Sequence, residues 1–215
     1  MKVGVIGSGD VGRTLGRGFA GAGHEVMIGS RSPNSEELRA WKKEAGAKAS
    51  TGTFAETARH GEVLVLAVRG DVAESAIDLA GESHFAGKLL IDATNPLDFS
   101  KGMPPGLFVG TTDSLGERIQ RKLPAAKVVK CFNIIGNVQM VHPKLPGGPP
   151  DMMICGNDAA AKLQTSETLK SLGWPGAIDV GGIDGARWLE ALVPLWVRAG
   201  SALGVWDHGF KVLHK

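Results

Sequence analysis

A short glycine-rich stretch near the N-terminus has the spacing of a phosphate-binding loop. The stretch Gly7-Ser8-Gly9-Asp10-Val11-Gly12 has the pattern GxGxxG, and it lies between an apolar run typical of a strand and a helical pattern. In this context the first glycine allows a tight turn, the second lets the backbone approach a pyrophosphate, and the third lets the helix pack closely on the strand. Backbone N–H groups and the helix dipole would then face the phosphates. The pattern therefore predicts a dinucleotide-binding site.

The residues at the end of the next apolar run bear on which dinucleotide is bound. A site for NAD needs Asp or Glu there, about 20 residues beyond the glycine motif, to hold the ribose 2′-hydroxyl group. The chain instead has Ser30, Arg31 and Ser32 after the run MIG. A carboxylate would repel a 2′-phosphate, whereas Arg31 can donate a fork of hydrogen bonds to it and the two serines add hydroxyl donors. The triplet therefore favours NADP over NAD.

Asp10 does not fit this site in an obvious way. Its carboxylate would lie near the pyrophosphate, where the like charge is repulsive. As a helix cap, however, it would accept hydrogen bonds from backbone N–H groups and be tolerated. The sequence leaves both interpretations open.

The glycine motif belongs to a chain in which strands alternate with helices. The apolar run at residues 63–68 is continuous rather than alternating in polarity, as expected when both faces of a strand are buried. Alternation of strands with helices predicts an α/β fold of the Rossmann type, in which a doubly wound, mainly parallel sheet is covered on both faces. Eight runs are expected to form strands: KVGVI, HEVMIG, AKAST, EVLVLAV, KLLIDAT, AKVVKCFN, DMMICG and GAIDVGG.

The last part of the chain has a different pattern. Residues 183–215 have helical character, hold three of the five tryptophans and contain Pro194, which should kink or break a helix. We expect residues 1–182 to form the nucleotide-binding domain. We expect residues 183–215 to be a small helical appendage that closes over the sheet or packs on a second subunit, because so many large apolar side chains are costly to leave in water.

Composition limits the class of protein. With 215 residues, of which 43% are hydrophobic and 21% charged, the chain has the composition of a globular protein with one sizeable core. The net charge is +2 and the basic residues are scattered, so nucleic acid is not an expected partner. No signal-type or membrane-spanning run is apparent, and we expect a soluble, cytoplasmic protein without a membrane partner. Cys131 and Cys155 lack metal-ligand spacing, so we expect buried thiols and no metal site.

With these residues placed, the chain resembles the coenzyme F420-dependent NADP oxidoreductases over nearly its whole length. The resemblance implies one Rossmann-type domain with a small C-terminal helical portion, and pairing as a homodimer. The run VVKCFNIIG is also similar to the cytoplasmic reductase domain of the STEAP metalloreductases, a related NADPH-binding domain that passes electrons to a flavin. The motifs that carry the family resemblance are the glycine motif, Gly29-Ser30-Arg31, Ala67-Val68-Arg69, Asn95-Pro96, Phe132-Asn133-Ile134-Ile135-Gly136 and Leu192-Val193-Pro194-Leu195.

The family resemblance also implies which residues bind the cofactor. Archaeal members often have a further basic residue where this chain has Ser35, which indicates weaker phosphate binding here. The predicted cofactor-binding residues are Gly7, Ser8, Gly9, Asp10, Val11, Gly12, Ser30, Arg31, Ser32, Ser35, Ala67, Val68, Arg69, Asn95 and Asn133.

On the acceptor side the candidates are Asn133, Ile135 and Gly136. Asn133 follows a strand, and ligands of α/β proteins bind at the carboxyl edge of the sheet, so its amide is placed to bond the nicotinamide or the acceptor ring. Archaeal members typically have a proline after the fourth strand and a different sequence in place of FNIIG. The chain therefore departs from the family pattern on the acceptor side.

The implied chemistry is hydride transfer between NADP(H) and a small redox molecule, the deazaflavin coenzyme F420. Such a step needs neither a nucleophile nor a metal, because the protein supplies alignment and a polar environment while the two ring systems carry the electrons. The chain contains neither HExxH nor GxSxG. We therefore predict no catalytic acid, base or nucleophile.

Two other functions are compatible with the same NADP site. The first is an NADPH-dependent reductase that uses an ordinary flavin or a bound metal chelate as its acceptor. The second is a sensor that binds NADPH tightly without turning over any acceptor. Because all three hypotheses share the cofactor site, only a test of acceptors separates them.

Overall fold

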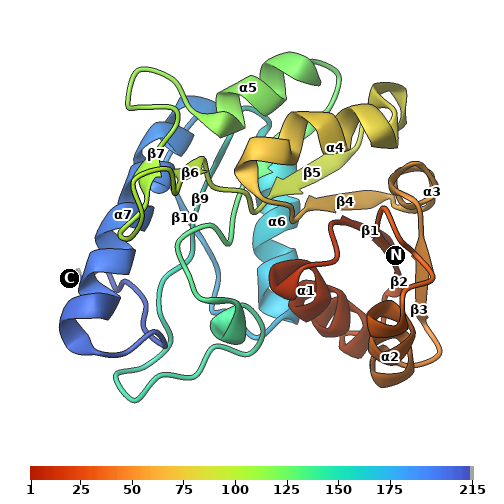
Figure 1. The fold of residues 1–215 in the computed structure, drawn as a ribbon, viewed down its shortest axis with the longest axis horizontal. Helices are drawn as coiled ribbons and strands as arrows, with labels where there is room; N and C mark the ends of the chain where they lie inside the picture. The colour runs from red at the N-terminus through yellow and green to blue at the C-terminus, as the bar shows by residue number, and fades with distance from the viewer. Residues whose placement is uncertain (214–215) are drawn as a thin grey trace.

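An eight-stranded sheet runs through the middle of the computed structural model, which describes residues 1–213 (Figure 1). Its strands lie in the order β10-β9-β8-β5-β4-β1-β2-β3. The six strands from β8 to β3 are parallel and have the order of a Rossmann sheet, in which the direction of winding reverses between β1 and β4. The bounds are β1 Lys2–Ile6, β2 Glu25–Gly29, β3 Ala49–Gly52, β4 Val63–Leu66, β5 Leu89–Asp92, β8 Lys127–Lys130, β9 Met153–Gly156 and β10 Ile178–Asp179.

The sheet contains one antiparallel pairing. Strand β9 runs antiparallel to β8, and β10 then pairs parallel with β9 at the edge of the sheet. Each of the eight predicted runs supplies one strand, so the expected α/β fold with a mainly parallel sheet is confirmed.

Helices cover both faces of the sheet. One face packs against α1 (Asp10–Gly21), α2 (Glu36–Ala45) and α6 (Ala159–Ser171) through a single apolar cluster. The other face packs against α3 (Phe54–His60), α4 (Ala73–Ala80) and α5 (Leu115–Lys122) through a second cluster. This double covering explains the continuous apolar strands, because both faces of each central strand are removed from water.

Local side-chain hydrogen bonds fix where several helices begin. Asp158 accepts a hydrogen bond from the backbone N–H of Ala161 at 2.8 Å and so caps α6, as the sequence predicts. Thr53 and Glu56 form a reciprocal capping box at the start of α3. These caps set the lengths of the loops that lead from the strands into the helices.

The C-terminal segment contains one long helix, α7 (Ala186–Leu203), at the end of the sheet opposite β3 (Figure 1). Of the two effects expected of Pro194, a kink or a break, the break is not found, because the helix continues past the proline. The helix is held on both sides of the proline, because Leu189, Val193 and Val197 are buried. The division into domains at residue 182 stays a prediction, and residues 214–215 of its second part lie outside the described residues.

After α7 the chain folds back on itself. The His208 ring stacks on Trp196 with centroids 4.4 Å apart, and Asp207 accepts a hydrogen bond from the Gln139 side chain at 2.7 Å. This tail therefore packs beside the loop at residues 133–140. None of the helices within residues 1–213 is both long and apolar enough to span a bilayer.

A small hairpin lies outside the main sheet, and the sequence does not predict it. Strands β6 (Leu97–Asp98) and β7 (Gly106–Leu107) pair antiparallel between β5 and α5. Each strand has only two residues, which is too short to show periodicity.

Candidate functional site

The glycine motif forms a tight turn at the carboxyl end of β1. Gly7 has a φ of +119°, a backbone conformation that residues other than glycine rarely adopt. A side chain at Gly12 would meet the carbonyl oxygen of Gly7, so the third glycine lets α1 start close against the turn. A Cβ at Gly9 would meet no atom within 4 Å, so the loop leaves open space there. This geometry fits a loop whose backbone meets phosphate groups.

Three adjoining clefts follow the edge of the sheet where β1, β2, β4 and β5 end. The Arg31 cleft, of about 420 Å³, is lined by residues 7–9, 30–32 and 67–69 together with Phe54 and one side of α4. The central cleft, of about 330 Å³, lies between residues 9–11, residues 67–71 and Asn95. The hairpin cleft, of about 570 Å³, lies between β6–β7, the Gly70–Val72 turn and α5. Neighbouring clefts share residues 67–69 on one side and Leu97 with Phe99 on the other, so they form one continuous groove.

Arg31 and its two serines lie together in the Arg31 cleft. Ser30 accepts hydrogen bonds from the Ser32 backbone N–H at 3.1 Å and from the Ser8 hydroxyl at 3.2 Å, which ties the end of β2 to the glycine turn. Arg31 is exposed and has no hydrogen-bond or ion-pair partner among residues 1–213. A guanidinium without a carboxylate partner is available for an anion such as a 2′-phosphate.

Ser35 does not line the Arg31 cleft. Its side chain accepts a hydrogen bond from the Leu38 backbone N–H at 3.3 Å and caps α2. This contact gives Ser35 a role in the fold, and its predicted contact with the cofactor stays a prediction.

Asp10 is the first residue of α1 and does not cap it, because Gly9 holds the cap position. Its carboxylate pairs with Arg13, one helical turn later, at 2.6 Å, and Arg13 also contacts Glu37 on α2. The Arg13 guanidinium therefore offsets part of the negative charge beside the glycine turn. The capping hydrogen bond expected of Asp10 is not formed. The expected repulsion between its carboxylate and a pyrophosphate is reduced by the Arg13 cation.

Residues 67–69 extend from β4 into the groove, and their predicted contact with the cofactor stays a prediction. Ala67, Val68 and Arg69 line both the Arg31 cleft and the central cleft. Arg69 donates hydrogen bonds to both carboxylate oxygens of Asp71, at 3.1 and 2.5 Å. Unlike Arg31, Arg69 is already paired with an acid.

Asn95 and Asn133 join the ends of β5 and β8. The Asn95 amide donates to the Asn133 carbonyl oxygen at 2.8 Å, and the Asn133 amide donates to the Asn95 side-chain oxygen at 3.0 Å and to Leu189 of α7 at 2.9 Å. Asn95 lines the central cleft, whereas Asn133 is buried and lines none of the three clefts. Asn133 therefore holds Asn95 in position by hydrogen bonds from the buried side of the groove.

The other acceptor-side candidates also lie behind the groove. Ile135 is buried, and a Cβ added at Gly136 would lie within 4 Å of Trp196 and of the Trp206 carbonyl oxygen. Neither residue lines the three clefts. A direct contact of these residues with the acceptor stays a prediction.

A buried ionic cluster lies beneath Asn95 and Asn133. The Lys130 ammonium group is 2.7 Å from Asp92 and 2.8 Å from Glu190, and it donates a hydrogen bond to the Thr94 carbonyl oxygen at 2.9 Å. Glu190 also accepts hydrogen bonds from two backbone N–H groups at the start of α5. Burial acts to lower the pKa of Lys130, but the two carboxylates outweigh it and raise that pKa. The cluster joins β5, β8, α5 and α7 just below the groove.

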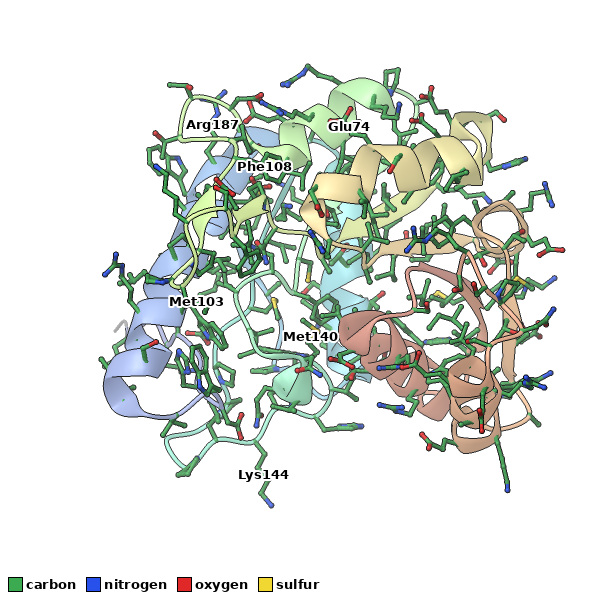
Figure 2. The ribbon with its side chains drawn as sticks, viewed as in Figure 1. Glu74, Met103, Phe108, Met140, Lys144 and Arg187 are labelled. Atoms are coloured by element: carbon green, nitrogen blue, oxygen red, sulfur yellow. The ribbon has the colours of Figure 1, made fainter. Side chains whose placement is uncertain are left out.

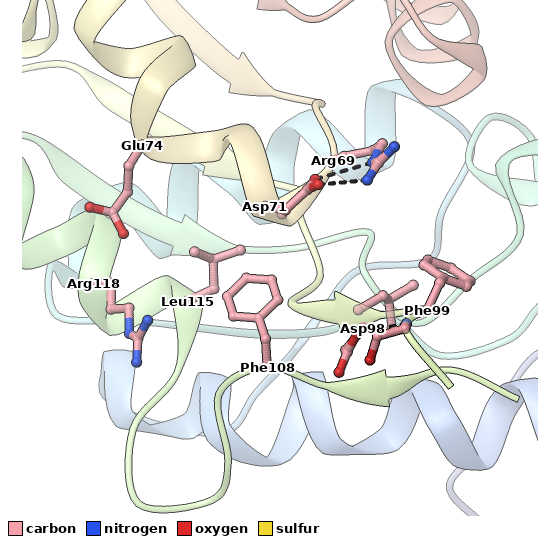
Figure 3. A pocket seen from close by; sticks show the side chains of 11 residues that line it. Arg69, Asp71, Glu74, Asp98, Phe99, Phe108, Leu115 and Arg118 are labelled. Atoms are coloured by element: carbon pink, nitrogen blue, oxygen red, sulfur yellow. Dashed lines mark hydrogen bonds and ion pairs between the residues drawn. The ribbon is translucent and has the colours of Figure 1, made fainter. Parts of the chain in front are cut away.

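The hairpin cleft contains residues that sequence reasoning missed. Figure 3 shows the Phe108 ring pointing into the cleft, with Glu74 and Arg118 at one end and Phe99 at the other. Glu74 and Phe108 lie on the side of the molecule near α5 (Figure 2). The signal in the sequence that could have found this cleft is the pair Phe99 and Phe108, which flank the Gly- and Pro-containing stretch at residues 100–107.

Both cysteines are buried thiols, as the sequence predicts. Burial raises the pKa of Cys155 to about 12 and raises the pKa of Cys131 well above its ordinary value. At neutral pH neither residue is a thiolate, so neither is a nucleophile.

Comparison with known proteins identifies the family to which this chain belongs. A family model described as NADP oxidoreductase, coenzyme F420-dependent, matches residues 2–96. The F420-dependent NADP reductase of Methanothermobacter marburgensis is 32% identical over 209 residues, which cover 92% of each chain. The chain belongs to the F420-dependent NADP reductase family. The crystal structure of a candidate member of this family from Arthrobacter sp. FB24 has 43% identity and a TM-score of 0.95 over the full length of both chains.

A metalloreductase is also similar. Metalloreductase STEAP3 of Rattus norvegicus is 34% identical over 206 residues, which are 91% of this chain but 38% of that protein. Both resemblances expected from the motifs are thus found, and the resemblance to the F420-dependent family extends over whole chains.

Proposed function

We propose that the protein is an oxidoreductase that transfers a hydride between NADP(H) and the deazaflavin coenzyme F420. Membership of the F420-dependent NADP reductase family supports the choice of both partners. The observation that carries the proposal is the continuity of the three clefts. A dinucleotide with its phosphates at the glycine turn would place its nicotinamide beside a second cavity, which is large enough for another ring system.

The chain's residues fit NADP at three points. The space in front of Gly9 admits a pyrophosphate, Arg31 is free for a 2′-phosphate, and Ser30 holds the glycine turn against the end of β2. Residues 67–69 and Asn95 border the central cleft, where they would fix the nicotinamide half. When bound, NADPH supplies a hydride that, with one proton from solvent, converts F420 to F420H2 and leaves NADP⁺.

The test is anaerobic mixing of the protein and NADPH with oxidised F420, and separately with FMN or FAD. We expect rapid loss of the visible absorbance of the deazaflavin and slow or no loss with the flavins. The variant Gly9→Val serves as a control that should not bind NADPH. Bleaching of the flavins alone would contradict the proposal and favour a flavin or metal reductase, and bleaching of neither with NADPH bound would favour a sensor.

The similarity to STEAP3 favours one second candidate, an NADPH-dependent reductase that passes electrons to a flavin or to a metal chelate. The reductase and the F420-dependent enzyme would use the same NADP groove and differ only in the acceptor. The acceptor panel therefore distinguishes them.

We also propose that the protein works as a homodimer in the cytoplasm. Trp188, Leu192, Leu195 and Ala199 follow one another on one face of α7 with helical spacing, and Trp188 and Leu195 are 62% and 52% exposed. A second copy would cover this apolar stripe. The two unpaired thiols suit a reducing compartment.

A further inference from the structure

We propose that the buried cluster of Asp92, Lys130 and Glu190 positions the Asn95 side chain at the nicotinamide end of the groove. The three charged residues would act through the neighbours that hold Asn95, without touching the cofactor themselves. This inference rests on the NADP groove of the proposed function, but not on the identity of the acceptor.

The chemical nature of the cluster is the first argument. The side chains of Asp92, Lys130 and Glu190 are at most 2% exposed. Taking three charged groups out of water costs stability, and well-packed apolar residues in the same place are often as stable or more stable. A buried ionic cluster is therefore better explained by the geometry that it fixes than by the stability that it adds.

The cluster holds the residue directly before Asn95. Asp92 accepts hydrogen bonds at Oδ1 from the Thr94 backbone N–H at 2.9 Å and from the Thr94 hydroxyl at 2.6 Å. The Lys130 ammonium group donates to the Thr94 carbonyl oxygen at 2.9 Å and lies 2.7 Å from the other carboxylate oxygen of Asp92. All three polar groups of Thr94 are thus bound by the cluster, which fixes the peptide plane that leads into Asn95.

The Asn95 side chain is held by a second route. Its amide donates to the Asn133 carbonyl oxygen at 2.8 Å, and its side-chain oxygen accepts from the Asn133 amide at 3.0 Å. Asn133 in turn donates at 2.9 Å to the carbonyl oxygen of Leu189, the residue before Glu190 of the cluster. The backbone and the side chain of Asn95 are therefore both fixed by contacts that lead back to the cluster.

The backbone directly before Asn133 is strained. Phe132 is fully buried and has a φ of +66°, in the left-handed region that a bulky residue rarely adopts. Such strain persists only where the surrounding contacts over-determine the backbone, and it is common at ligand sites. The strain indicates that the pairing of Asn133 with Asn95 is maintained against the local backbone preference.

Asn95 is the member of this arrangement that faces the groove. It is half-buried and lines the central cleft, whereas Asp92, Thr94, Lys130 and Glu190 line none of the three clefts. These four residues are therefore positioning residues rather than catalytic residues. Alignment of a bound ring depends on groups that are held with little freedom. Loosening the cluster should therefore weaken binding of the nicotinamide half of NADPH and leave the Arg31 end unaffected.

The test compares two ligands that share the Arg31 end of the site. NADPH carries the nicotinamide half, and 2′,5′-ADP lacks it. Thr94→Val removes the hydroxyl bond to Asp92 with little change of shape. We expect it to raise the dissociation constant of NADPH about threefold and Lys130→Met to raise it about tenfold, the size of effect typical of one hydrogen bond. Both variants should leave the constant of 2′,5′-ADP within about twofold, because the Arg31 end is distant from the cluster.

A double-mutant cycle shows whether Lys130 acts through Asn95. Asn95→Ala alone should weaken NADPH binding about tenfold, and adding Lys130→Met to it should weaken binding no further. Lys122→Met and Thr165→Val are matched controls. Lys122 also pairs with two carboxylates, but at the surface, and the buried Thr165 hydroxyl donates to the Ala161 carbonyl oxygen within α6. Neither control should change either dissociation constant.

Isothermal titration measures the constants at a temperature where circular dichroism shows each variant to be folded. If Lys130→Met does not fold, the cycle is made with Thr94→Val. Equal weakening of the two ligands, an unchanged NADPH constant in Thr94→Val, or additive effects within the cycle would overturn the inference. The expected constants without reduction of F420 by the wild type would contradict only the choice of acceptor in the proposed function.

Discussion

At the scale of single residues, we propose that Arg31 decides between the two dinucleotides. Its guanidinium is free within the described chain, in contrast to Arg13 and Arg69, which pair with acids. The ribose-binding carboxylate of an NAD site is absent from the end of β2, and Ser30, Arg31 and Ser32 occupy its place.

Replacing Arg31 with Ala should weaken NADPH binding about a hundredfold and leave NADH binding nearly unchanged. Charged hydrogen bonds contribute about 1.5 to 3 kcal/mol each, and about 1.4 kcal/mol corresponds to a factor of ten. Titration of each nucleotide by protein fluorescence measures both constants. The control is Arg39→Ala, which removes an exposed arginine of α2 outside the groove. Equal losses for both nucleotides would show that Arg31 does not contact the 2′-phosphate.

Replacing Gly9 with Val should abolish the binding of NADPH and NADH without unfolding the protein. A Cβ at this position would meet no atom within 4 Å, and the valine side chain would fill the space at the glycine turn. Gly21→Val is the matched control, because Gly21 also faces open space but lies away from the groove. Circular dichroism reports folding and isothermal titration reports binding, and an unchanged affinity would exclude this loop as the phosphate site.

The glycine turn and the serine–arginine triplet could be located from the sequence because each follows a recognisable strand, whereas the family resemblance implied residues 67–69. The sequence did not predict the contact of Asp10 with Arg13 or the burial of Asn133. Both depend on neighbours that are distant in the sequence or lie on another element. A residue's type and its distance from a strand do not determine which side chain will pair with it.

At the scale of elements, the buried cluster around Lys130 holds four elements together below the groove. Its members come from β5, β8 and α7, and Glu190 also binds the first N–H groups of α5. The ends of β5 and β8 lead directly to Asn95 and Asn133.

Replacing Lys130 with Met should lower the free energy of unfolding by about 3 to 5 kcal/mol, because it leaves two carboxylates buried without their cation. Urea denaturation measures this change. Lys122→Met is the control, since Lys122 also pairs with two carboxylates, Asp78 and Glu82, but at the surface. An equal loss of unfolding free energy in the two variants would show that burial of the cluster does not increase its contribution to stability.

The ion pair between Glu117 and Arg187, which joins α5 to α7, should contribute stability in a pH-dependent way. Hydrogen bonds from Arg187 lower the pKa of Glu117 below its ordinary value of 4.5. A lowered pKa in the folded state gives stability that is present above pH 4.5 and is lost as the pH falls through the folded-state pKa. Glu117→Gln should therefore cost stability at pH 7 and cost less at pH 3.

Urea denaturation at the two pH values tests the Glu117 prediction. Glu167→Gln is the control, because Glu167 pairs with Lys170 on the exposed side of α6. A cost of Glu117→Gln that is the same at pH 7 and pH 3 would contradict the assignment.

The elements differ in how well the sequence predicts them. The eight main strands were predicted because each is a short apolar run between helices. The β6–β7 hairpin has two residues in each strand, and its position depends on packing rather than on a local pattern. Pro194 predicted a kink or a break in α7, and no break is found, because apolar side chains before and after the proline are buried and hold the helix in place.

At the scale of the whole molecule, the exposed stripe on α7 is the proposed dimer surface. Replacing Leu195 with Glu should convert a dimer into a monomer, because it places a charge at the centre of an apolar interface. Sedimentation equilibrium measures the mass of each variant. Ser201→Glu adds a charge to an exposed position of α7 outside the stripe and should leave the dimer intact. A monomeric wild type would contradict the proposal.

The whole groove depends on the winding of the sheet. Parallel strands bring the glycine turn, the serine–arginine triplet and Asn95 to one edge, and this could be predicted from the order of strands and helices. The hairpin cleft could not be predicted, because its walls come from three segments that only the folded chain brings together.

Isotopic labelling shows whether NADPH transfers its hydride directly to the deazaflavin. NADPH carrying deuterium at both C4 positions of the nicotinamide is mixed with oxidised F420 and the protein, and the product is examined by NMR. We predict one deuterium at C5 of the reduced deazaflavin and none released to water. Reduced deazaflavin without the label, or no reduced deazaflavin at all, would contradict direct hydride transfer between the two rings.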